Sequence, residues 1–193
     1  MLTRLMAADG LDRGAAPITE PAWLGFVEYV AETMDVGPGT RIFVVNCGAG
    51  SFLLPLWENG YVVGGLDRSP DLIRLAAEAM PDGRFSLGEA AALDPAEPWD
   101  VVVACSTFGS FPDLDYARGV LARMAAKATH AIAVLDVPDI DRTVGAPPGG
   151  LFYDRAWMFR VLAEIGASAV QVEEQKIESY AFAPFRFNVF ARL

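Results

Sequence analysis

The chain contains the stretch Arg41-Ile-Phe-Val-Val-Asn-Cys-Gly-Ala-Gly-Ser51 and, after a helix-compatible segment, Gly64-Gly-Leu-Asp67. In the first stretch, a run of buried-strand residues ends in a turn of small residues. In the second, another apolar strand ends on a carboxylate. An open parallel sheet holds a nucleoside with this layout, because the backbone approaches closely at the glycines and the acid can bind a ribose. The two strands therefore predict a parallel α/β sheet with a nucleoside site where they end.

Composition narrows the class of protein. The chain has 193 residues, 53% of them hydrophobic, which is enough for one domain with a full core. Its 15 Lys and Arg against 25 Asp and Glu give a net charge of −10. A nucleic-acid partner normally requires a basic surface, so we expect none. The start is too short and too charged for a secretion signal, and no apolar run is long enough for a membrane span. We therefore expect a cytoplasmic protein with no membrane partner.

Apolar runs and turn residues predict the order of elements. Strands are expected at residues 42–45, 61–66, 84–87, 100–104, 130–135, 169–179 and 185–191. Helices are expected between them, and the start signals are Thr19, Ser69, Asp113 and Asp154. The joint between the last two strands is predicted to be short, which favours antiparallel pairing. The fold predicted is a doubly wound α/β structure with a seven-stranded, Rossmann-like sheet whose last strand is antiparallel.

The N-terminal residues differ from the rest. Residues 1–18 show no clear period and are expected to form an arm or a short lid, while residues 19–193 form the main domain. The loop expected at 138–150 is rich in proline and glycine.

Several polar residues have a structural interpretation beside a functional one. His130 is the only histidine and starts the fifth strand, away from the carboxyl ends where ligands gather, so we interpret it as structural. Cys47 and Cys105 end two strands and are expected to be neighbours that behave as small apolar residues. A dinucleotide site needs a third glycine where Leu53 stands, which makes an NAD-linked oxidoreductase a less favoured alternative.

Four segments together carry a family resemblance. They are Asn46-Cys-Gly-Ala-Gly50, Asp67-Arg-Ser-Pro-Asp71, Gly88-Glu-Ala90 and Trp99-Asp-Val-Val-Val103. In this order, and with a closing hairpin, they resemble the class I S-adenosylmethionine-dependent methyltransferases over nearly the whole chain, from about Pro21. The tail, Tyr180 to Phe190, looks like the last hairpin of the small-molecule branch.

The resemblance implies a set of residues for the cofactor S-adenosylmethionine (SAM). The turn containing Asn46, Cys47, Gly48 and Gly50 would pass close to its methionine part. Asp67 would accept hydrogen bonds from both ribose hydroxyls. Arg68, Glu89 and Ala90 would border the adenine, and Cys105 and Ser106 the sulfonium. Two positions depart from the family pattern: Val44 replaces an acid, and Asn46 replaces the first glycine. Asparagine tolerates the left-handed backbone that such a turn needs.

The expected reaction is methyl transfer to the oxygen or nitrogen of a small-molecule acceptor. Asp136 and Tyr153 are the candidate catalytic residues, and the candidate substrate-binding residues are Phe108, Phe111, Tyr180 and Arg186. No acidic cluster accompanies Asp136, so no metal ion is expected. The departures at Val44 and Asn46 leave open an alternative, a cofactor-binding protein without methyl transfer, such as a cyclase-like catalyst or a regulatory or assembly subunit. The apolar hairpin also makes a homodimer possible.

Overall fold

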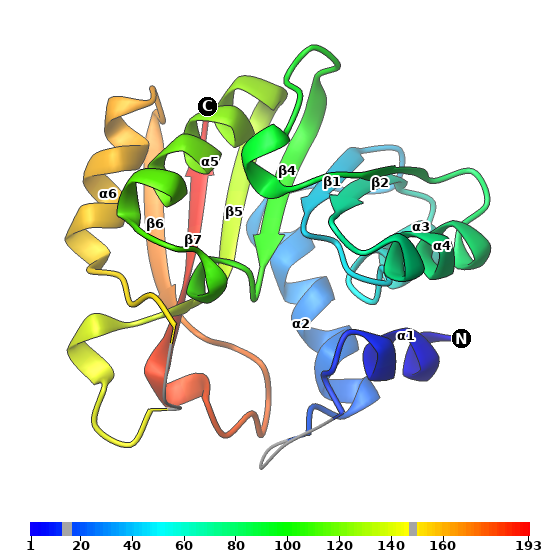
Figure 1. Ribbon diagram of the computed structural model, residues 1–193, viewed down its shortest axis with the longest axis horizontal. Helices are drawn as coiled ribbons and strands as arrows, with labels where there is room; N and C mark the ends of the chain where they lie inside the picture. The colour runs from blue at the N-terminus through cyan, green and yellow to red at the C-terminus, as the bar shows by residue number, and fades with distance from the viewer. Residues whose placement is uncertain (13–16, 147–149) are drawn as a thin grey trace.

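A seven-stranded sheet runs through the middle of the protein, in the order β3-β2-β1-β4-β5-β7-β6 (Figure 1). This computed structural model describes residues 1–12, 17–146 and 150–193. The strands are β1 (Arg41–Val45), β2 (Val62–Asp67), β3 (Arg84–Leu87), β4 (Trp99–Cys105), β5 (Ala128–Pro138), β6 (Ala169–Glu174) and β7 (Arg186–Arg192). Only β7 runs antiparallel to its neighbours. The predicted sheet with its reversed last strand is therefore confirmed.

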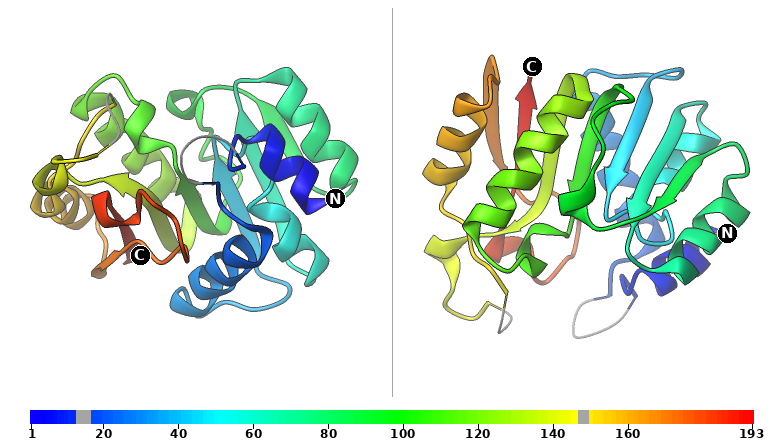
Figure 2. Two further views of the ribbon diagram at one scale, coloured as in Figure 1. Left: turned by 90° about the horizontal axis from the view of Figure 1, so that it is seen from below. Right: turned by 45° about the horizontal axis from the view of Figure 1, so that its top comes forward.

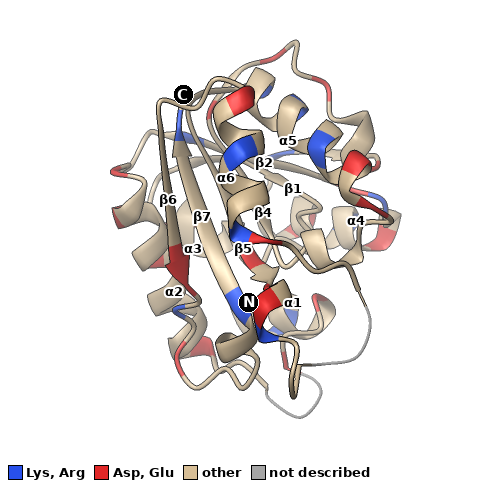
Figure 3. Ribbon diagram, turned by 90° about the vertical axis from the view of Figure 1, so that its left-hand side faces the viewer, with Lys and Arg blue, Asp and Glu red and all other residues tan. Residues whose placement is uncertain are grey.

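Helices cover both faces of the sheet. One face carries α2 (Glu20–Thr33), α3 (Leu53–Glu58) and α4 (Pro70–Ala79), and the other carries α5 (Leu114–Lys127) and α6 (Arg155–Glu164). Each predicted capping side chain accepts a hydrogen bond from the backbone of its helix; these residues are Thr19, Ser69, Asp113 and Asp154. Charged residues lie on helices and loops and also near strand ends, as Glu173 and Glu174 do on β6 and Arg186 does on β7 (Figure 3).

The central strands are apolar because both of their faces are covered. In β1, Ile42 and Val44 belong to the core beneath α2 and α3, while Phe43 and Val45 belong to the core beneath α5. Successive side chains of a strand point to opposite faces, so a strand between two helical layers carries no polar alternation. Among the described residues, no helix combines the length and the apolar character needed to cross a membrane.

Two sequence-based expectations need correction. The strand expected at 169–179 ends at Glu174, and residues 175–185, including a 3-10 turn at Ala183–Phe185, connect it to β7. The connection is thus longer than predicted, although the pairing is antiparallel as expected. The chain leaves the sheet here because Gln175 and Ile177 both turn into buried positions. The second correction concerns the N-terminus, where Leu2–Ala8 form a helix, α1.

Helix α1 forms because one of its faces is apolar and buried. The helix is too short for this pattern to show a clear period in the sequence. Leu2, Leu5 and Met6 are buried, and their spacing puts them on one helical face. Residues 13–16 and 147–149, parts of the predicted arm and of the predicted proline-rich loop, lie outside the described residues. The function of the arm as a lid stays a prediction.

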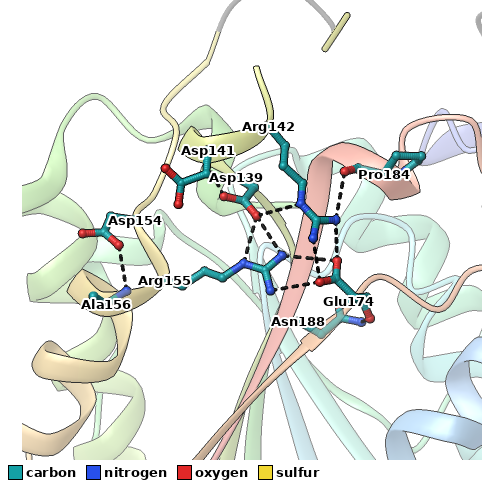
Figure 4. Close-up of polar contacts among 9 residues, drawn as sticks. All are labelled: Asp139, Asp141, Arg142, Asp154, Arg155, Ala156, Glu174, Pro184 and Asn188. Atoms are coloured by element: carbon teal, nitrogen blue, oxygen red, sulfur yellow. Dashed lines mark hydrogen bonds and ion pairs between the residues drawn. The ribbon is translucent and has the colours of Figure 1, made fainter. Parts of the chain in front are cut away.

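An ion network around the buried Asp139 joins the ends of β5 and β6 to the start of α6 (Figure 4). The side chain of Asp139 is only 1% exposed, and it accepts a hydrogen bond from Nε of Arg155 at 2.9 Å and forms an ion pair with Nη2 of the same residue at 2.8 Å. Both Arg155 and Arg142 also bind the carboxylate of Glu174 with two nitrogens each. The hydrogen bonds from Arg155, and those from Arg142, lower the pKa of Glu174. The network fixes the loop after β5 against the connection that precedes β7.

Candidate active site

The turn after β1 has the backbone that the small residues predicted. Asn46, Gly48 and Gly50 all have positive φ, at 53°, 58° and 86°. Asparagine and glycine are the residues that adopt this left-handed region at low cost. The N–H of Cys47 donates to the carbonyl of Leu66 at 2.9 Å, which ties the turn to the end of β2. The turn therefore survives the replacement of the first glycine by Asn46.

Asp67, the last residue of β2, faces this turn. One carboxylate oxygen accepts the N–H of Gly48 and the other accepts the N–H of Ser69, both at 2.9 Å. The residue is 8% exposed. Capping of α4 falls to the hydroxyl of Ser69, which accepts the N–H of Leu72 at 3.4 Å. Asp67 is thus held in one orientation at the edge of the turn.

Two cavities meet at Asp67. The first, of about 260 Å³, is lined by residues that include Trp23, Val44, Cys47, Gly48, Cys105 and Ser106. The second, of about 300 Å³, is lined by residues that include Arg68, Glu89, Ala90, Phe111 and Tyr116. Both cavities share Asn46, Asp67 and Ser110. Their volumes are at the lower end of those of small-molecule sites. Every predicted cofactor residue except Gly50 lines one of these cavities.

Asp136 forms the centre of a buried polar cluster at the end of β5. Its carboxylate accepts hydrogen bonds from the hydroxyl of Ser106 at 3.0 Å and from the amide of Gln175 at 2.9 Å. Its N–H donates to the side chain of Asn188 at 2.9 Å, and its φ is 59°. Burial raises the pKa of Asp136, against the opposing charge of Arg186. Ser106 belongs both to this cluster and to the lining of the first cavity, so the cluster adjoins that cavity.

Most of the remaining predicted residues lie either in the hydrophobic core or in the polar cluster around Asp136. Tyr153 and Phe108 are fully buried, and the hydroxyl of Tyr153 donates to the carbonyl of Phe108 at 2.9 Å. Neither lines the two cavities, whereas Phe111 lines the second one. Arg186 donates to the carbonyl of Asp136 at 3.4 Å. Burial, followed by the charge of Asp136, raises the pKa of Tyr180. Tyr180 and Arg186 therefore lie with Asp136, and Tyr153 does not.

The histidine and the cysteines take the places expected of them. His130 is exposed near the start of β5 and contacts Arg192. Cys47 and Cys105 are free thiols that line the same cavity, and burial raises the pKa of each. Both thiols are therefore protonated near neutral pH. The described residues hold no group of three or more His, Cys, Asp or Glu side chains suited to a metal ion.

The sequence did not reveal three residues of this region: Asp9, Gln175 and Asn188. Asp9 follows α1, and its carboxylate lies in the first cavity. Gln175 and Asn188 hold Asp136 from the connection after β6 and from β7. Asp9 stands in a segment of ordinary composition, and Gln175 lies in the polar run 173–176, where nothing distinguishes it from its neighbours. A polar residue such as Asn188 within the apolar run of β7 was the one available signal, since a buried amide needs a partner.

Comparisons with known proteins agree with this geometry. Residues 43–132 match the family model described as a methyltransferase domain. The chain is 36% identical over 104 residues to nocamycin O-methyltransferase of Saccharothrix syringae. That alignment covers 48% of this chain and 36% of the relative, so the chain spans about a third of that protein's length.

Solved structures share the fold. A magnesium protoporphyrin IX methyltransferase of Synechocystis with bound SAH has a TM-score of 0.73 at 18% identity, covering 98% of this chain and 96% of that one. An amino pentose methyltransferase of Micromonospora echinaspora with bound SAM has a TM-score of 0.75 at 15% identity, covering 89% and 92%. Residues 43–132 therefore resemble a methyltransferase domain, and the chain as a whole shares the fold of these SAM- and SAH-bound methyltransferases.

Proposed function

We propose that the protein transfers the methyl group of SAM to the oxygen or nitrogen of a small-molecule acceptor. The observation that carries the proposal is the position of Asp67, a carboxylate held by two backbone N–H groups where the two cavities meet. A charged acceptor fixed in this way suits a pair of ribose hydroxyls. The relatives with bound SAM or SAH and the O-methyltransferase relative support the same assignment.

The residues of the cleft suggest how the cofactor would lie. The second cavity, with Arg68, Glu89 and Ala90, would take the adenine, and Phe111 adds an aromatic wall there rather than at the acceptor. The first cavity would take the amino-acid end beside the turn, with Cys105 and Ser106 toward the sulfonium. When bound, SAM supplies an electrophilic methyl group. The protein then has to orient the acceptor and exclude water.

Asp136 is our candidate for the residue that orients the acceptor. Gln175 keeps its amide nitrogen on Asp136, because its own oxygen accepts the N–H groups of Lys176 and Ile177, at 2.8 and 3.2 Å. The carboxylate retains lone pairs beyond the bonds from Gln175 and Ser106, so it can accept a hydroxyl or amine proton of the acceptor. We assign Tyr153 a structural role, since its hydroxyl is already bonded within the core.

Titration with SAM and with its product S-adenosylhomocysteine (SAH) tests the proposal. Both should bind and raise the melting temperature, and NAD should not. Release of the methyl group to a panel of small phenols, hydroxy acids and amines then separates transfer from binding alone. Stabilisation by NAD instead of SAH would favour the oxidoreductase alternative. Binding of SAH with no transfer to any acceptor would favour the non-transferring alternative.

The variant Asp136→Asn tests the acceptor site. It removes the negative charge and keeps the size, so the transfer rate kcat should fall by about tenfold or more while the Kd for SAH stays within about twofold. The matched control is Asp141→Asn, an exposed carboxylate in the turn Ile140–Arg142. If Asp136→Asn has the same kcat as the wild type, Asp136 does not act at the acceptor site.

We also propose the partners and location that the charge favours. A net charge of −10 disfavours nucleic acid as a partner, and the small-molecule methyltransferases among the relatives favour a small molecule as the acceptor. Cytoplasmic location and a homodimer through the hairpin remain part of the proposal, and size-exclusion chromatography with light scattering tests the latter.

A further inference from the structure

Helix α1 lies beneath the carboxyl ends of the strands, close to α4, as the view from below shows (Figure 2). Its buried residues Leu2, Leu5 and Met6 anchor it to the core shared with α2 and α3. Asp9 directly follows this helix as its C-cap residue. The packing of α1 therefore decides where the Asp9 carboxylate lies.

That carboxylate occupies the turn after β1. One oxygen accepts the N–H of Ala49 at 2.5 Å, and the other accepts the hydroxyl of Ser51 at 2.5 Å and its N–H at 3.2 Å. The contact with Gly48 is so close that a side chain there would collide with Asp9. Three donors from the turn thus already hold a carboxylate, and that carboxylate belongs to the chain itself.

This arrangement is electrostatically costly. Burial raises the pKa of Asp9, and the charge of Asp67 acts in the same direction, against the bonds from Ser51 and Ala49. A second carboxylate cannot use the same three donors while Asp9 holds them. The amino-acid end of SAM carries such a carboxylate, and the proposed function brings it to this cavity.

We propose that Asp9 is an internal competitor of the cofactor: its carboxylate fills the position at residues 48–51 that the amino-acid end of SAM requires, and binding must displace it. This inference rests on the proposed function and concerns the regulation of the same cleft. The apparent affinity for SAM and SAH is reduced by the fraction of molecules in which Asp9 holds the turn. Any partner or condition that moves α1 would raise that affinity.

The test compares the Kd values of two ligands that differ only at the amino-acid end. SAH carries the carboxylate, and 5′-methylthioadenosine has the same nucleoside and sulfur but lacks the amino-acid group. Asp9→Ala should lower the Kd for SAH by about tenfold or more, which corresponds to a turn that is open in about a tenth of wild-type molecules. The Kd for 5′-methylthioadenosine should stay within about twofold. The matched control is Asp12→Ala, which removes an exposed carboxylate from the turn after α1.

A second variant covers the case in which the alanine variant does not fold. Asp9→Asn keeps the side-chain size and removes the charge, and it should lower the Kd for SAH in the same direction. Unchanged or weaker SAH binding in both folded variants, with 5′-methylthioadenosine still bound, would overturn the role of Asp9 and leave the proposed function standing. If neither ligand binds the wild type or the variants, both the proposed function and this inference are wrong.

Discussion

Replacement of Asp67 by alanine is expected to weaken the binding of SAH by about a hundredfold or more. A hydrogen bond to a charged acceptor contributes about 1.5–3 kcal/mol, and Asp67 is proposed to accept two from the ribose. The substitution also removes the partner of the Gly48 N–H and so loosens the turn. Isothermal titration of the wild type and the variant with SAH measures the effect.

Two further variants test whether the loss of SAH binding is specific to the carboxylate of Asp67. Asp71→Ala removes an acid from the first turn of α4, where the side chain is 85% exposed, and it should leave the Kd within about twofold. Asp67→Asn keeps an acceptor without the charge and should give an intermediate affinity. If Asp67→Ala binds SAH as the wild type does, the ribose lies elsewhere and the cleft assignment fails.

The second large effect concerns stability. Arg155→Met is expected to lower the free energy of unfolding by about 3 kcal/mol, because it leaves the buried charge of Asp139 without its main partner. Arg142 remains as a weaker partner, because its Nε forms an ion pair with Asp139 at the longer distance of 3.7 Å. The aliphatic stem of Met preserves part of the packing beside Phe187, over whose ring the guanidinium lies at 5.1 Å. Urea denaturation measures the change.

The control for this variant lies on the same helix. Arg160→Met replaces an exposed arginine of α6 and should change the free energy of unfolding by less than about 0.5 kcal/mol. Equal stability of the two variants would mean that the network in Figure 4 contributes little.

The sequence predicted the parts of the fold that local chemistry determines. The apolar run 42–45 could only be a strand covered on both faces, and Ser69 and Asp113 marked helix starts that the structure confirms. Asp67 was recognisable because its spacing from the glycines is set within one strand-helix-strand unit. These features need no knowledge of the rest of the chain.

The remaining features depend on contacts between distant segments. Asp9 meets Ser51, and Gln175 meets Asp136, only after the sheet has formed. Tyr153 was a candidate catalytic residue, yet its ring packs against Phe108 and its hydroxyl donates to the Phe108 carbonyl within the core. The length of the connection after β6 was wrong because the strand ends at Glu174, after which Gln175 and Ile177 turn into buried positions outside the sheet.

The position of β7 affects how the chain assembles during synthesis. β7 lies between β5 and β6, yet the ribosome makes it after both of them. Until residues 186–192 emerge, β5 presents an unpaired, apolar edge and β6 has no neighbour to join. A nascent or truncated chain lacking this segment would expose a template for aggregation, and chaperones would recognise this intermediate rather than the finished protein.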